Sequence, residues 1–147
     1  MDYKKLRKEM MLLINTIDAL PASRELSIAR TVIQSTQMWC GQGIGLSGNV
    51  SPYAENDGSR RTVEDIKPLF DHTEDLLVDD IGRDDEIRTI DEMREFLSSK
   101  KNEVVPLLVV TEHPEKKVVD EMIYIGVVEA RMWLGARLGA IRDASRT

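Results

Sequence analysis

The sequence predicts an all-α protein built from helical hairpins, and three observations support this class. Apolar residues recur at three-and-four spacing through the first 46 residues and again through the last third of the 147-residue chain. Pro21 and Pro114 interrupt this pattern, and a long apolar segment follows each of them. An eight-residue frame, Met-Trp-x-Gly-x-x-x-Gly, occurs at residues 38–45 and at 132–139, at a similar distance after each proline. We therefore predict two related hairpins joined by an acidic helical segment, all within a single domain of residues 1–147.

The first hairpin is predicted over residues 1–46. Residues 2–20 carry apolar side chains at the spacing of an amphipathic helix, which Pro21 ends. Ser23 has the side chain of a good N-cap for the next helix, because its oxygen can accept a hydrogen bond from a free backbone N–H group. That helix should extend to about Leu46.

The middle of the chain is predicted to be a loop followed by acidic helix. Residues 47–63 are rich in Gly, Pro, Asn and Ser, which is typical of a loop. Residues 64–100 read as one or two helices, broken near Gly82. Of the 26 acidic residues in the chain, 13 lie between Glu64 and Glu95, so the negative charge is concentrated there.

The second hairpin is predicted over residues 101–147. A long apolar helix should run from about Glu115 to Ile141. The preceding stretch, EVVPLLVV at residues 103–110, is ambiguous, because its β-branched residues suit a strand while the parallel with the first hairpin favours a helix interrupted by proline. We favour the helix.

Composition excludes several classes of function. A net charge of −6 argues against binding to duplex nucleic acid. Apolar runs fall far short of the roughly 20 residues that span a bilayer, so no membrane segment is expected. The N-terminus lacks the pattern of a signal peptide, and a single cysteine suits a reducing compartment, so we expect a cytoplasmic protein. We find no cofactor-binding motif, no catalytic residues and no metal-ligand spacing between the histidines and Cys40.

The repeated frame raises a packing question. It places pairs of glycines on one face of each predicted helix, namely Gly41 with Gly45 and Gly135 with Gly139. A glycine inside a helix costs about 1 kcal/mol relative to alanine, so something should approach these backbones closely. A partner helix or another subunit is one explanation, and a flat ligand beside the tryptophan ring is the other.

Three places combine aromatic or cationic side chains that could bind a nucleotide. Arginines near the second tryptophan offer a fork matched to phosphate, although they also suit the C-terminus of a helix. A tyrosine precedes two arginines in the predicted loop and could stack on a base. The start of the second helix offers free N–H groups to an anion. The candidate ligand-binding residues are Arg24, Ser27, Trp39, Tyr53, Arg60, Arg61, Arg131, Trp133 and Arg137.

An enzymatic alternative rests on the acidic segment. Acidic residues surround His72 densely enough to suggest magnesium, as in all-α nucleotide pyrophosphohydrolases, although a solvated acidic helix face gives the same pattern. The spacing of carboxylates in this segment is looser than such enzymes use. A purely structural oligomer is the third possibility.

The stretch RELSIARTVIQSTQMWCGQGIG, with the following SPYAENDGSRR, resembles the phage helical-hairpin family of nucleotide sponges. These anti-CBASS and anti-Thoeris proteins sequester immune signalling nucleotides. The similarity covers about residues 23–76, and EARMWLGARLG near the C-terminus is a second, shorter likeness. The residues that carry it are Leu26, Ser27, Ala29, Met38, Trp39, Gly41, Pro52 and Tyr53.

This resemblance implies a homo-oligomer of helical hairpins in the cytoplasm of a bacterial host. It also implies binding, without turnover, of a cyclic di- or trinucleotide or a cyclised ADP-ribose species. From the resemblance and the candidate residues together, we expect a non-enzymatic phage anti-defence protein that sequesters a cyclic nucleotide messenger.

Overall fold

Four helices make up most of residues 1–48 and 82–144, the parts of the chain that the computed structural model describes. They are α1 (Tyr3–Asp18), α2 (Arg24–Leu46), α3 (Arg83–Val110) and α4 (Pro114–Ala144). No strand occurs in these residues, and the predicted all-α class is confirmed.

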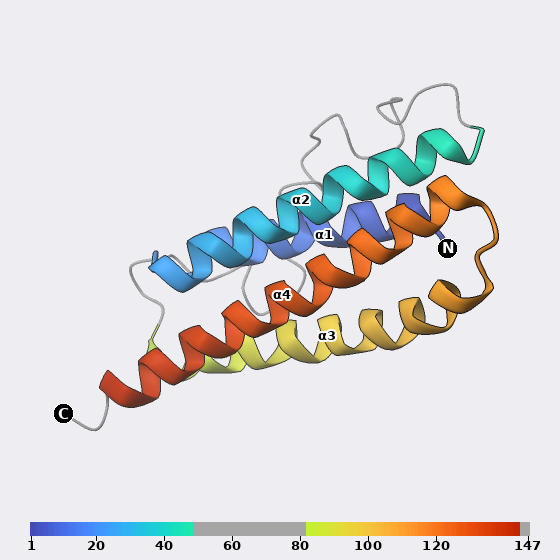
Figure 1. Cartoon of the computed structure of the whole chain (residues 1–147). Helices are drawn as coiled ribbons and strands as arrows, with labels where there is room; N and C mark the ends of the chain where they lie inside the picture. Colours follow the sequence, from blue (N-terminus) through green and yellow to red (C-terminus); the bar gives the residue numbers. More distant parts are fainter. Residues whose placement is uncertain (49–81, 145–147) are drawn as a thin grey trace.

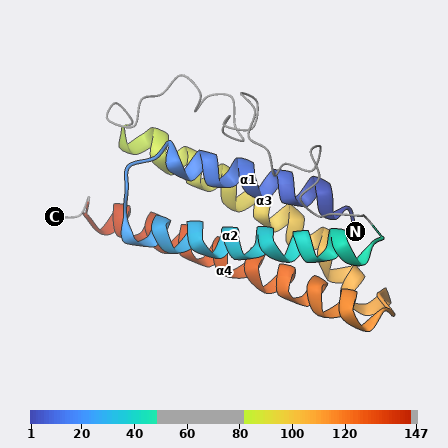
Figure 2. The ribbon, with the colours of Figure 1, turned by 90° about the horizontal axis from the view of Figure 1, so that it is seen from above.

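The helices pack as a four-helix bundle. In Figure 1, α2 and α4 run in opposite directions and α3 lies beside α4, and Figure 2 shows α1 beside α2. The contacts agree, because α1 packs on α2, α2 on α4 and α4 on α3. A buried ion pair of 2.8 Å between Lys100 and Glu9 joins α3 to α1 and completes the ring. Every neighbouring pair is antiparallel, and short connections of the kind common in such bundles join α1 to α2 and α3 to α4.

The first hairpin forms as its sequence predicts. Asp2 caps α1 by accepting a hydrogen bond from the backbone N–H of Lys5 at 3.0 Å. Ser23 caps α2 in the same way, accepting from the N–H of Leu26 at 3.2 Å. The chain leaves α2 through Gly48, whose positive φ of 88° favours glycine.

The second hairpin begins earlier than the sequence suggests. Helix α3 runs without a break across the expected boundary at residue 100, so the hairpin starts at Arg83 rather than at residue 101. Residues 103–110 are helical, and Pro106 lies one turn before the end of α3, where it is exposed to solvent. A proline there removes only one hydrogen bond of the last turn, and water can reach the carbonyl group that it frees. The rest of the predicted loop and the acidic stretch before Gly82 lie outside the described residues.

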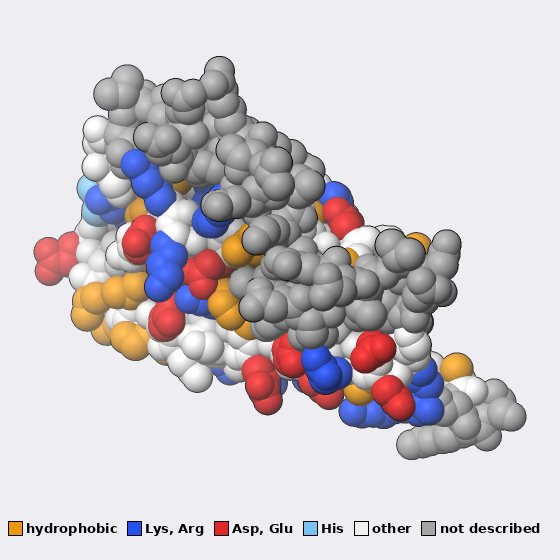
Figure 3. Space-filling model, turned by 180° about the vertical axis from the view of Figure 1, so that it is seen from behind, with side chains coloured by type: hydrophobic (Ala, Val, Ile, Leu, Met, Phe, Trp, Pro, Cys, Tyr) orange, Lys and Arg blue, Asp and Glu red, His pale blue; other side chains and the backbone are white. Residues whose placement is uncertain are grey.

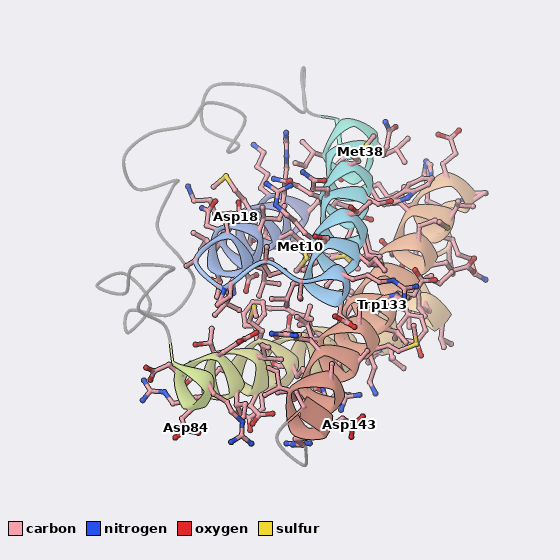
Figure 4. All side chains as sticks on the ribbon, turned by 90° about the vertical axis from the view of Figure 1, so that its left-hand side faces the viewer. Met10, Asp18, Met38, Asp84, Trp133 and Asp143 are labelled. Carbon is pink, nitrogen blue, oxygen red and sulfur yellow. The ribbon has the colours of Figure 1, made fainter. Side chains whose placement is uncertain are left out.

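The core combines residues of all four helices. Fully buried side chains include Met10 from α1, Ile33 from α2, Met93 from α3 and Leu134 from α4. Figure 4 shows Met10 in the interior of the bundle. This core orients the polar and cationic groups described below. No described helix is long and apolar enough to cross a membrane.

The expectation about the frame glycines is corrected in part. Apart from the neighbouring residues and nearby backbone of the same helix, no described atom lies within 4 Å of the place that a β-carbon would occupy at Gly41, Gly45 or Gly139. The close helix contacts instead use two other glycines. A β-carbon at Gly43 would overlap the ring of Tyr3, and one at Gly126 would overlap the hydroxyl of Thr36. The fourth frame glycine, Gly135, is approached by a side chain of α3. Packing among the described residues therefore does not explain three of the four frame glycines.

Candidate anion-binding groove

A solvent-open groove of about 780 Å³ lies between α3 and α4. A hollow of this volume is within the range that small-molecule ligands occupy. Helix α3 supplies most of its lining, and α4 supplies one arginine. We call it the Arg94–Arg131 groove, and its lining residues are Asp91, Arg94, Glu95, Ser98, Ser99, Asn102, Glu103 and Arg131.

Arg94 lies against the backbone of α4. Its Nη2 atom is 3.3 Å from the position that a β-carbon would take at Gly135. A larger residue there would displace the guanidinium, so Gly135 makes room for Arg94. The Nε–H of Arg94 is buried and has no hydrogen-bond partner in the described part of the chain.

Arg131 reaches the same groove from the opposite helix. Its Nε–H is also buried and has no hydrogen-bond partner among residues 1–48 and 82–144. Neither Arg131 nor Arg94 forms an ion pair within the described part of the chain. An unsatisfied buried donor costs about 1–3 kcal/mol and more when charged. Two such guanidinium groups in one groove make it suited to an anion, because phosphate oxygens match the arginine fork.

The other lining groups are hydrogen-bond acceptors and small polar side chains. Glu103 already pairs with Lys100 at 3.4 Å, whereas Asp91 and Glu95 are exposed along the groove. Ser98, Ser99 and Asn102 can both donate and accept. The carboxylates weaken the attraction for a bare anion. They also provide acceptors for hydroxyl and amino groups, so the groove fits a ligand that carries phosphates and hydrogen-bond donors together.

Arg137 is engaged elsewhere. Its Nε–H donates to Glu86 of α3 at 2.8 Å, and the carboxyl side chain is 7% exposed. This ion pair joins the first turn of α3 to the last part of α4. Arg137 thus has a structural partner, and losing it would leave a buried carboxylate unpaired.

The two tryptophans lie at the edge of the core, far from each other. Trp39 and Trp133 are half-buried and pack against the core cluster. The contact between Thr36 and Gly126 fixes the register of antiparallel α2 and α4. From that contact the tryptophans are three and seven positions away in opposite directions, which separates them by about 15 Å along the helix axes. Within one chain they cannot stack on the two faces of one base.

A second, shallower hollow surrounds the first frame. Its lining combines Trp39 with Met38, Ser35 and Gln42 of α2, and its volume is about 340 Å³. Figure 4 shows Met38 at the edge of the bundle, in agreement with an exposed fraction of 69%. No cation lines this hollow among the described residues.

The other sequence candidates that the structure describes do not line the groove. Arg24 and Ser27 lie exposed at the start of α2, where Ser23 already occupies one N–H group. Tyr53, Arg60 and Arg61 lie outside the described residues. Of the six candidates that the structure describes, only Arg131 lines the Arg94–Arg131 groove.

Arg94 was missed by reasoning from sequence, although its spacing carried a signal. It follows Ile90 by four positions and precedes Leu97 by three, and both of these are fully buried. A charged residue so placed lies at the edge of the apolar face of its helix. The acidic composition of the segment drew attention to magnesium instead.

Metal binding and thiol chemistry find little support in the described residues. They contain no group of three or more His, Cys, Asp or Glu side chains that could hold a metal ion. The acids around His72 that suggest magnesium lie outside these residues. Burial raises the pKa of the Cys40 thiol to about 12, so this cysteine stays protonated and unreactive at neutral pH.

Comparison with known proteins does not assign a family. No family model matches the chain, and no curated protein or solved structure matches it either.

Proposed function

We propose that this protein binds a small cyclic nucleotide in the Arg94–Arg131 groove and sequesters it without chemical turnover. The observation that carries the proposal is that Arg94 and Arg131 line one groove, and the Nε–H of each is buried without a partner among the described residues. The proposal joins this observation to the resemblance to phage nucleotide sponges. It thus includes a role in neutralising a bacterial immune messenger within the host cytoplasm.

The groove favours recognition of phosphate over recognition of the base. None of its described lining residues is aromatic, so these residues offer no platform for base stacking. Two arginines can each contribute about 1.5–3 kcal/mol through charge-assisted hydrogen bonds. After the cost of association, two or more phosphate contacts are consistent with micromolar binding. We expect affinity to depend more on the number of phosphates than on which bases the ligand carries.

We propose binding without hydrolysis because of the kinds of residue that line the groove. Arginine, serine and asparagine can hold a phosphodiester, but cleavage at neutral pH needs an activated nucleophile, a poised base or a metal. The carboxylates of the groove are exposed to solvent and do not adjoin a cysteine or histidine among the described lining residues.

The test is to incubate the purified protein with a panel of cyclic di- and trinucleotides, cyclic ADP-ribose isomers and inorganic phosphate. After removal of free ligand, heat releases what is bound, and mass spectrometry identifies it. Recovery of an intact cyclic nucleotide, with no linear product, supports the proposal. If the protein retains no cyclic nucleotide, or if a hydrolysed product is recovered, the proposed binding without turnover is contradicted.

A further inference from the structure

The guanidinium group of Arg94 packs against the backbone of α4 at Gly135. Its Nη2, Cζ and Nε atoms lie 3.3, 3.4 and 3.5 Å from the position that a β-carbon would take at Gly135. No described atom of another helix lies closer to that position, so the edge of the guanidinium that carries Nε and Nη2 is turned toward the glycine. We call this arrangement the packed position of Arg94.

The edge that faces Gly135 is the one with which an arginine binds a phosphate or a carboxylate. The N–H groups on Nε and Nη2 are parallel and form a fork that donates to two oxygens at once. Arg30 uses both donors of its fork, which bond to the two carboxylate oxygens of Asp18 at 2.8 and 3.2 Å. Figure 3 shows that on the face opposite to that of Figure 1, Lys and Arg side chains lie beside Asp and Glu side chains. Arg94 differs, because it forms no ion pair within the described part of the chain.

The packed position closes the Nε–H of Arg94 to ligands. This atom is buried and has no hydrogen-bond partner among the described residues. A phosphate oxygen is about as large as a water molecule, so a nitrogen that solvent does not reach cannot donate to a bound phosphate. Arg94 therefore offers its fork to the groove only after the guanidinium has left Gly135. The side chain has several rotatable bonds, and rotation about them moves it between staggered rotamers.

An anion in the groove changes the balance between these arrangements. A buried donor without a partner is unfavourable, so the packed position has a cost that a hydrogen bond to an anion would remove. Arg131 lines the same groove and also lacks an ion pair among the described residues. A phosphate between the two arginines attracts both, which favours a rotamer of Arg94 whose fork faces the groove.

We propose that Gly135 is a positioning residue for anion binding. It accommodates Arg94 in the packed position, and an anion draws the guanidinium into an open position in which Nε–H and Nη2–H donate to a phosphate. This inference rests on the proposed function and adds what controls the affinity of that site. When only a fraction of the free protein has the binding-competent conformation, the apparent affinity is reduced by that fraction. Contacts at residue 135 therefore set how tightly the groove binds.

The residue type at position 135 shifts Arg94 between the two positions. A β-carbon 3.3 Å from Nη2 is closer than the optimal van der Waals separation, so any side chain at this position disfavours the packed position. Gly139, one turn later in the same frame, has no such contact among the described residues. Gly135→Ala therefore shifts Arg94 toward the open position, and Gly139→Ala is the matched control with the same gain in helix propensity.

Hydrogen exchange of the Arg94 Nε–H tests the packed position without any ligand. The arginine Nε–H groups give separate signals in nitrogen–proton correlation NMR spectra of the labelled protein, and loss of one signal in Arg94→Met assigns it. In the unchanged protein this N–H should exchange slowly with water, because burial protects it. Gly135→Ala should speed the exchange about threefold or more by raising the open fraction, whereas Gly139→Ala should leave it unchanged. Gly135→Ser is a second variant if Gly135→Ala loses helical circular dichroism.

Titration with inorganic phosphate tests the effect of an anion. In the unchanged protein, phosphate should move the proton signal of the Arg94 Nε–H to lower field, because the donor gains a charged acceptor. Gly135→Ala should reach half of this shift at about three- to tenfold lower phosphate concentration. Gly139→Ala should reach it at the same concentration as the unchanged protein.

Three results would overturn the inference. They are equal exchange rates of the Arg94 Nε–H in the two glycine variants, no shift of its signal with phosphate, and weaker phosphate binding by Gly135→Ala. The last result would mean that the packed position is itself the one that binds. No cyclic nucleotide enters either experiment, so failure of the protein to retain one contradicts the proposed function alone.

Discussion

The phenol of Tyr3 donates a hydrogen bond of 2.6 Å to Asp120, a residue 117 positions further along the chain. Both side chains are buried, and Thr111 donates to the second carboxylate oxygen at 2.9 Å. One carboxylate thus ties the start of α1 to α4 and to the turn that precedes it. The same tyrosine ring lies against Gly43, so it also positions α2.

Removing the phenol should destabilise the fold. Tyr3→Phe leaves one oxygen of Asp120 without its donor, and a hydrogen bond to a charged group contributes about 1.5–3 kcal/mol. We expect the free energy of unfolding in urea to fall by about that amount. Tyr124→Phe is the matched control, because Tyr124 is half-buried and has no hydrogen bond from its hydroxyl within the described residues. An equal loss in both variants would remove the special role of Tyr3.

Alkaline pH should destabilise the protein through two groups. Burial, followed by the hydrogen bond and the charge of Asp120, raises the pKa of Tyr3. Burial alone would lower the pKa of Lys100, but its hydrogen bond to Glu9 and the nearby carboxylates raise it overall. The folded state thus holds both protons more tightly than the unfolded state, whose tyrosine and lysine titrate near pH 10.

The stability due to these groups is complete below about pH 10 and is lost as pH rises through the folded-state pKa values. Urea unfolding between pH 8 and 11.5 should show a constant free energy at first and a decline above about pH 10. The decline should be shallower in Tyr3→Phe. A flat profile up to pH 11.5 would be inconsistent with the raised pKa values.

The buried ion pair between Lys100 and Glu9 should matter more than the exposed one between Arg30 and Asp18. The side chains of the first pair are 8% and 14% exposed, and those of the second are 34% and 51% exposed. Lys100→Met leaves a nearly buried carboxylate unpaired, which costs about 3–5 kcal/mol. Arg30→Met should cost about 1 kcal/mol or less. Thermal unfolding of the two variants measures the difference, and similar melting temperatures would refute it.

Two neighbouring glycines of α2 should respond to alanine with opposite signs. At Gly43 a β-carbon overlaps the buried Tyr3 ring, so Gly43→Ala forces a repacking and should lower stability by about 1–3 kcal/mol. At Gly45 the space is open among the described residues, so Gly45→Ala should raise stability by up to about 1 kcal/mol through helix propensity. Chemical denaturation measures the free energy of unfolding of both variants. Equal losses of stability in the two would contradict the predicted difference in sign.

Periodicity and capping predicted the helices well, because apolar spacing and Ser23 act locally. The repeated frame predicted that both tryptophan-bearing segments are helical, and they lie in α2 and α4. The sequence could not reveal which glycines make close contacts, because Gly43 and Gly126 are selected by the register between helices. The sequence also could not show that Arg131 lines the groove while Arg137 is held in an ion pair. Both are arginines near one tryptophan, and only the position of Glu86 on another helix determines that Arg137 is paired.

The most direct test of nucleotide binding is calorimetric titration of the arginine variants. Arg94→Met and Arg131→Met retain much of the aliphatic stem and remove a donor that has no partner in the unbound protein, so the melting temperature should stay equal or rise. Arg142→Met, an exposed arginine outside the groove, is the matched control. With the cyclic nucleotide that the protein retains, each groove variant should weaken binding about 10- to 100-fold, while the control changes it little. Unchanged affinity in both groove variants would contradict the proposed site, and failure of the unchanged protein to bind any cyclic nucleotide would contradict the proposed function itself.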